Sequence, residues 1–185
     1  MKKLMIAAAI VCAAAMSHGA NYYWGIFDGS IKDLDGKASN GATVYLFDNG
    51  GTTTMADIVS AFALGTDIST LGIIDSDATA SGNVWGPDDP ITYSGRAGGT
   101  TWNAYMAIVD GDNLFISDLS NLITTPTDIS ATDISWNSQA TASGKSYELP
   151  GGYQGAGWYT AVPEPTSGLL LLLGVAGLAL RRRRA

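Results

Sequence analysis

The chain of 185 residues contains very little cysteine and histidine. Its one cysteine, Cys12, and its one histidine, His18, both precede residue 21. If an N-terminal leader that includes them is removed, the remaining body has neither residue. The body then has no disulfide, no thiolate nucleophile, no Cys/His zinc site and no imidazole for acid–base chemistry.

Basic residues are scarce in the body, which we define as residues 21–162. It holds four of them against 16 of the 17 acidic residues of the chain, so its net charge is −12, whereas the whole chain has −7. A body this acidic repels phosphate backbones, which excludes nucleic acid as a partner. The remaining basic residues stand at the two ends of the chain, as Lys2, Lys3 and Arg181–Arg184.

The N-terminal segment, residues 1–20, has the pattern of a secretory signal peptide. Lys2 and Lys3 form a positive start, and Leu4–Ala15 is an apolar run of suitable length. An uncleaved membrane anchor is the alternative, but the run is short for a membrane span. We therefore expect an exported protein with a removable leader.

The sequence leaves two positions open for leader cleavage. Cleavage after Ala20 places the bulky His18 three residues before the cut, where a small residue is preferred. Cleavage after Ser17 places Ala15 there and fits the small-x-small rule better, but it keeps His18 in the mature chain.

The C-terminal segment combines a proline-rich start, an apolar run and a basic end. Gly168 to Leu180 is 13 residues, about 20 Å as a helix, whereas a bilayer core is about 30 Å thick. The run therefore spans only with bilayer thinning and snorkelling arginines. The predicted membrane anchor consists of Leu169, Leu170, Leu171, Leu172, Leu173, Leu178 and Leu180.

The positive ends predict the topology of the precursor. Four consecutive arginines resist translocation and should stay cytoplasmic, and the leader lysines stay there too. The acidic body is then placed outside the inner membrane. The predicted cytoplasmic stop consists of Arg181, Arg182, Arg183 and Arg184.

The order of these tail features closely resembles the PEP-CTERM sorting signal. Pro163, Glu164 and Pro165 match its motif, Leu169–Leu180 match its span, and Arg181–Arg184 match its stop. The resemblance implies that the chain is a substrate of exosortase, a multi-pass membrane cysteine protease of Gram-negative-type bacteria. It covers the tail and the expected leader alone, and it implies no activity for the body.

The body shows dense turn signals between short apolar or alternating runs, which is typical of β-structure. Residues 54–64 interrupt this pattern as a short helix, with a Thr cap, Asp57 in its first turn and Gly65 after its end. We therefore predict a mainly β protein, an antiparallel β-sandwich-like domain with one short helix, flanked by a signal helix and a membrane helix. The predicted strands are Tyr22–Phe27, Thr43–Phe47, Trp102–Val109, Leu114–Ser117, Ile129–Trp136 and Gly157–Val162. The turn Asp110–Asn113 is predicted to join the third and fourth of these strands in a hairpin.

Two acidic segments resemble fragments of calcium-binding loops. Closely spaced Asp and Asn side chains supply the oxygen ligands that Ca²⁺ prefers. Neither fragment completes an EF-hand, because Val44 and Asn121 occupy the positions where that loop needs a glutamate. Plain turns are the alternative interpretation, and the calcium candidates are Asp33, Asp35, Asp110 and Asp112.

The five tryptophans have two interpretations. Flat indole rings stack on sugars, but tryptophan also fills β-cores. The core interpretation is favoured, because the sequence does not place two tryptophans on one exposed face. The tryptophans are Trp24, Trp85, Trp102, Trp136 and Trp158.

Together these features predict a non-catalytic exported bacterial surface or extracellular-matrix protein without a cofactor. It has three segments: a signal peptide (1–20), the β-rich body (21–162) and the sorting tail (163–185). Its expected partners are the secretion machinery, an exosortase-type protease and the inner membrane, where an anchored intermediate precedes the cell surface. The alternatives are a carbohydrate-binding, calcium-stabilised biofilm module that contacts extracellular polysaccharide, and an unprocessed tail-anchored membrane protein.

Overall fold

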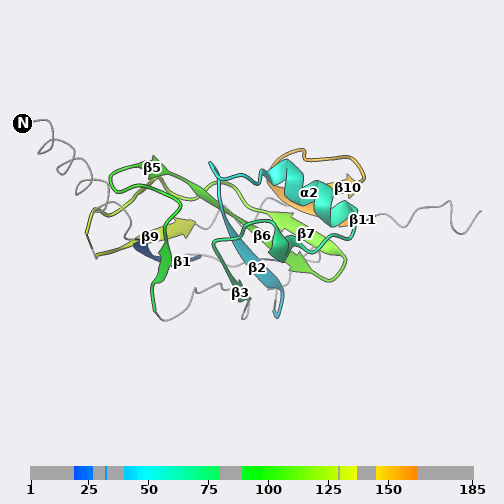
Figure 1. Ribbon diagram of the computed structural model, residues 1–185. Coiled ribbons are helices and arrows are strands. Elements are labelled where there is room, and N and C mark those ends of the chain that lie inside the picture. Colours follow the sequence, from blue (N-terminus) through cyan, green and yellow to red (C-terminus); the bar gives the residue numbers. More distant parts are fainter. Residues whose placement is uncertain are drawn as a thin grey trace, which may run out of the picture.

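A computed structural model of the chain (Figure 1) describes residues 19–26, 32, 40–79, 89–128, 130–136 and 145–161. The leader before residue 19, the calcium candidates Asp33 and Asp35, Trp85 and the tail 163–185 lie outside these ranges. Within them, no helix combines the length and apolar character needed to cross a membrane.

The larger sheet has six strands in the order β10-β11-β7-β6-β2-β3. Its central strand β6 is buried on both faces, because alternate residues point to opposite sides and both sides are covered. The strands of this sheet are β2 (Thr43–Asp48), β3 (Asp75–Ala78), β6 (Ala104–Asp110), β7 (Asn113–Ile116), β10 (Ser146–Leu149) and β11 (Gly157–Ala161).

A smaller sheet has three strands in the order β4-β1-β9, and two further strands form a separate pair. In the small sheet β1 pairs with β4 antiparallel and with β9 in parallel. The strands are β1 (Ala20–Ile26), β4 (Ile91–Tyr93) and β9 (Ala131–Trp136), and the separate pair is β5 (Thr101–Trp102) with β8 (Ile123–Thr124).

The two sheets share one apolar core. Tyr22 and Trp24 of the small sheet pack with Val44, Leu46 and Met106 of the large sheet. The opposite face of the large sheet forms a second core with the helix. Figure 1 shows β1 and β9 toward one end of the molecule and the helix beside β10 and β11 at the other.

The mainly β class is confirmed, with one α-helix among the described residues, but the strand pairing is not purely antiparallel as expected. The pairs β1–β9 and β10–β11 are parallel. A tight hairpin forces an antiparallel pair, whereas the long connection between β1 and β9 imposes no such constraint. β10 and β11 are joined by residues 150–156 alone, but that loop brings the chain back so that the two strands run in the same direction. About a hundred residues separate β1 from β9, so the sequence held no local information on their direction.

The predicted helix 54–64 appears as α2 (Met55–Ala63) and begins with a capping box. Thr54 Oγ1 accepts a hydrogen bond from the Asp57 backbone N–H, and the Asp57 carboxylate accepts one from the Thr54 N–H. Ile58 and Val59 are fully buried against the large sheet. Gly65, at a φ of +67°, follows the helix end, and a single 3-10 turn, η1 (Ile68–Thr70), comes after it.

Candidate functional site

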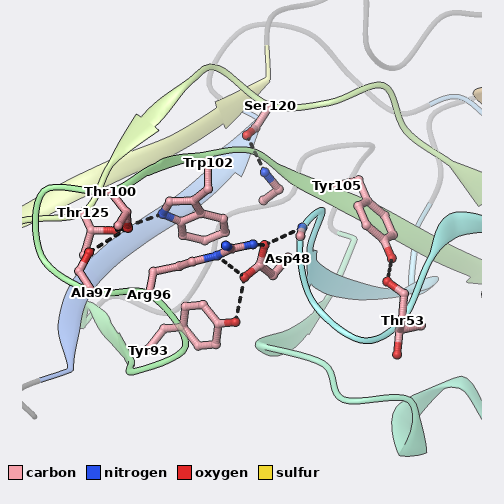
Figure 2. Close-up of polar contacts among 12 residues, drawn as sticks. Asp48, Thr53, Tyr93, Arg96, Ala97, Thr100, Trp102, Tyr105, Ser120 and Thr125 are labelled. Atoms are coloured by element: carbon pink, nitrogen blue, oxygen red, sulfur yellow. Dashed lines mark hydrogen bonds and ion pairs between the residues drawn. The ribbon is translucent and has the colours of Figure 1, made fainter.

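The most highly connected polar group of the described body is the Asp48 carboxylate at the end of β2 (Figure 2). Arg96 donates to both of its oxygens, from Nε at 2.7 Å and from Nη2 at 2.5 Å. The Tyr93 hydroxyl donates to Oδ2 at 2.9 Å, and the Gly50 N–H donates to Oδ1 at 2.8 Å. We call Asp48, Tyr93 and Arg96 the carboxylate clamp.

The clamp keeps its carboxylate ionised in a buried place. Burial raises the pKa of Asp48, but the Arg96, Gly50 and Tyr93 hydrogen bonds and the Arg96 charge outweigh it and leave that pKa below its ordinary value. Burial, together with the hydrogen bond to Asp48, raises the pKa of Tyr93 to about 12. Hydrogen bonding to Asp48 raises the pKa of Arg96, so the guanidinium stays charged.

The geometry of the clamp indicates a structural rather than a catalytic role. A carboxylate has about four acceptor positions, and four donors occupy those of Asp48. Figure 2 shows the Arg96 side chain reaching Asp48 between the rings of Trp102 and Tyr93, with the guanidinium carbon 5.8 Å from the Trp102 ring centre. Because Asp48 lies on the large sheet and Tyr93 on the small sheet, the clamp joins the two.

Sequence reasoning did not identify this clamp. Its three members lie up to 48 residues apart, and no short motif links them. One sequence feature could have drawn attention to it, since Arg96 is the only arginine in residues 21–162. A lone arginine in an acidic body has many possible partners, so only the fold selects Asp48.

The calcium candidates that the structure describes lie at one hairpin. Asp110 ends β6 and stands opposite Asn113, and Asp112 is exposed in the two-residue turn between the strands. Within the described ranges, no group of three His, Cys, Asp or Glu side chains gathers in a metal-binding arrangement. The turn itself confirms the hairpin that the sequence predicted, with Gly111 at a φ of +57°.

The four described tryptophans are core residues, as the favoured interpretation stated. Each exposes 5% or less of its surface, so none offers an indole face for stacking on a sugar. The ring N–H groups of three of them donate hydrogen bonds to other residues of the body. Trp24, for example, donates to the Asp75 carboxylate at 2.7 Å. These residues are Trp24, Trp102, Trp136 and Trp158.

A groove with a different lining lies between α2 and the β6–β7 hairpin. It has a volume of about 300 Å³. Its walls combine aromatic rings, carboxylates and a threonine hydroxyl, which suits a ring-shaped ligand that is neutral or positively charged. The side chains that give this character are Tyr45, Phe62, Thr66, Asp67 and Asp112.

The body ends at β11, and this strand is firmly held. It is hydrogen-bonded on both sides, to β10 and to β7. Trp158 is buried against Phe115, and the Tyr159 hydroxyl donates to the Gly155 carbonyl at 2.6 Å. Ala161, the last residue of the strand, stands opposite Leu149. The C-terminal tail therefore continues from a fixed point on the fold.

Comparison with known families identifies the tail. Residues 161–184 match the family model of the PEP-CTERM protein-sorting motif, which confirms the resemblance seen in the sequence. The match begins at the last residue of β11. Neither a comparison with curated proteins nor one with solved structures found a match to this chain.

Proposed function

We propose that this PEP-CTERM chain is a non-catalytic exported protein of a bacterial surface or extracellular matrix, cut at its tail by an exosortase-type membrane protease. The observation that carries the proposal is the sorting motif at residues 161–184, which starts where β11 ends. The motif thus follows the folded body without a spacer. On this account the body is the domain that is exported, and the tail is the signal that directs its sorting.

The chemistry of the tail supports a role as a protease substrate. Pro163 and Pro165 lack backbone N–H groups and have a fixed φ, and each disfavours helix in the residue before it. Both effects favour an extended backbone of the kind that proteases bind. The apolar run after them holds the segment at the membrane, and Arg181–Arg184 stop it from passing through.

The body is suited to leave the membrane after the cut. Its net charge of −12 favours solubility and repels the anionic surface of a bilayer. β11 is an inner strand of the large sheet, and both of its partners, β10 and β7, belong to the body and not to the tail. Removal of the tail should therefore leave the fold intact.

Replacement of the motif tests this proposal. The variant Pro163→Ala/Glu164→Ala/Pro165→Ala and the control Thr166→Ala/Ser167→Ala are expressed as full chains with the protease, and their masses and locations are compared. The first should retain its tail, and the control should be processed like the parent. If the triple variant is cut and located like the parent, the sorting role of these three residues is wrong.

A second function, carbohydrate binding, is favoured by the groove beside α2. Aromatic rings stack on the apolar faces of sugars, and carboxylates and hydroxyls accept their O–H groups. Tyr45 and Phe62 supply the rings, and Asp67 and Asp112 supply the carboxylates. In the hypothesis drawn from the sequence, the tryptophans were the candidate sugar-binding residues. Here the residues of the groove have that role.

Titration with polysaccharides tests the second function. The full chain is titrated with neutral and amino-sugar polymers in a calorimeter, beside Tyr45→Ala and the control Tyr23→Ala, which removes a tyrosine 40% exposed outside the groove. Binding by the parent and by Tyr23→Ala, with loss in Tyr45→Ala, is the expected result. No heat of binding in the parent would refute this function.

A further inference from the structure

Strand β1 begins inside the segment whose sequence predicts a leader. Ala20, the last residue of that segment, is only 3% exposed and belongs to the core shared by the two sheets. It also stands opposite Tyr93 in the pairing of β1 with β4. Ala20 is thus part of the folded body by burial and by backbone pairing.

The contact between these strands extends to Gly19. A Cβ atom placed on Gly19 would lie 2.4 Å from Cγ2 of Thr92, so the chain already passes close against β4 at this residue. One residue after Ala20, the Thr92 hydroxyl donates to the Asn21 side-chain oxygen at 3.0 Å. The first described residues therefore form a continuous contact with β4.

β4 depends strongly on this contact. It has three residues, and their three partners in β1 are Ala20, Asn21 and Tyr22. The residue opposite Ala20 is Tyr93, whose hydroxyl donates to Asp48 in the carboxylate clamp. Loss of Ala20 would remove one of the three pairs and loosen the strand that carries Tyr93.

We propose that the leader is cut between Ser17 and His18, so that the mature chain begins at His18. Signal peptidases read small residues one and three positions before the cut, and Ser17 and Ala15 occupy these positions. The other cut that the sequence allowed would place His18 third before the bond and discard the buried Ala20. The proposal rests on the proposed function, since it needs export.

The reaction is hydrolysis of one peptide bond with water as co-reactant. The bond from the Ser17 carbonyl carbon to the His18 nitrogen breaks. Water supplies the hydroxyl of the new Ser17 carboxyl group and a proton to the new His18 amine. The mature body then keeps one imidazole, at its N-terminus.

Intact mass and N-terminal sequencing of the exported full chain test the assignment. An N-terminus at His18 is the expected result. An N-terminus at Asn21 overturns both the bond and the role of Ala20, and any other internal N-terminus overturns the bond. An exported chain that still begins at Met1 overturns leader removal and with it this inference. A chain that is found only inside the cell contradicts export, so failure of the proposed function is distinguished from failure of this inference.

Two variants locate the bond by its chemistry. Ala15→Phe places a bulky ring at the third position before the proposed cut, whereas the control Ala14→Phe places the same ring at a position that is not read. The uncut precursor should accumulate for Ala15→Phe and not for Ala14→Phe. Normal processing of Ala15→Phe contradicts the assignment.

A redirected cut tests the structural role of Ala20. Ser17→Phe/His18→Ala blocks the proposed bond and creates a small-x-small pattern that ends at Ala20, so the mature chain should begin at Asn21. Its melting temperature should be lower than that of the parent by about 3 °C, because one β1–β4 pair and a buried side chain are lost. Equal melting temperatures would show that Ala20 is not needed by the body.

Discussion

Leu149 on β10 and Ala161 on β11 stand opposite each other at the last position of a parallel strand pair. Leu149 is buried, and the sorting motif begins at Ala161. Leu169, the first leucine of the apolar run, comes eight residues after Ala161, which is about 27 Å of fully extended chain. On the proposed function, the uncut tail would therefore hold the body close to the membrane.

The carboxylate clamp should contribute strongly to stability. Asp48→Asn removes the charge that pairs with Arg96, and breaking a buried pair from one side costs about 3–5 kcal/mol. We expect a loss of about 3 kcal/mol in the free energy of unfolding. This value is at the low end of the range because a quarter of the Arg96 side chain is exposed, so water screens the ion pair. Urea denaturation measures the loss. Asp133→Asn, an exposed control on β9, should change it little, and equal losses in both variants would contradict the role of the clamp.

Acid should lower the stability of the fold partly through protonation of Asp48. Because its pKa is lower in the folded state than in the unfolded chain, its contribution is full above the unfolded value of about 3.9 and is lost as the pH falls through the folded value. The free energy of unfolding, measured by denaturation between pH 5 and 2, should therefore fall less steeply with decreasing pH for Asp48→Asn than for the parent. Identical slopes would show that the carboxylate is not stabilised in the folded state.

The buried tyrosines Tyr22 and Tyr105 should respond differently to loss of the hydroxyl. Among the described side chains, the Tyr22 hydroxyl is buried without a hydrogen-bond partner, whereas the Tyr105 hydroxyl donates to the Thr53 carbonyl at 2.9 Å. Tyr22→Phe should leave the melting temperature unchanged or raise it, and Tyr105→Phe should cost about 1 kcal/mol. A larger loss in Tyr22→Phe than in Tyr105→Phe would contradict this account.

The contribution of the α2 capping box to stability should be measurable with a single substitution. Thr54→Ala removes the side-chain acceptor for the Asp57 N–H, which typically costs about 1 kcal/mol. The control Thr52→Ala changes an exposed threonine outside the helix and should cost much less. Thermal melts followed by circular dichroism compare the two, and a Thr54→Ala melt that coincides with the parent would rule out the capping contribution.

Local features of the fold were predictable from the sequence. The helix was found because its cap, its apolar face and Gly65 all lie within a dozen residues. The β6–β7 hairpin was found because Gly111 stands between two apolar runs. The tail motif was recognised because its parts follow one another directly.

Features that depend on distant residues were not predictable. β3 reads Asp-Ser-Asp-Ala and shows no apolar alternation, since it is an edge strand whose neighbour provides the apolar residues. The parallel partner of β1 and the link from Arg96 to Asp48 are set by the complete fold. The start of β1 at Ala20 was missed because Ala20 fell within the predicted leader, residues 1–20.

The mass of the C-terminal peptide from the exported protein tests the central claim most directly. The surface or extracellular fraction is digested, and its most C-terminal peptide is identified by mass spectrometry. Our account predicts a chain that ends before Leu169 and lacks Arg181–Arg184. An exported protein whose mass still includes the four arginines would contradict processing at the sorting tail.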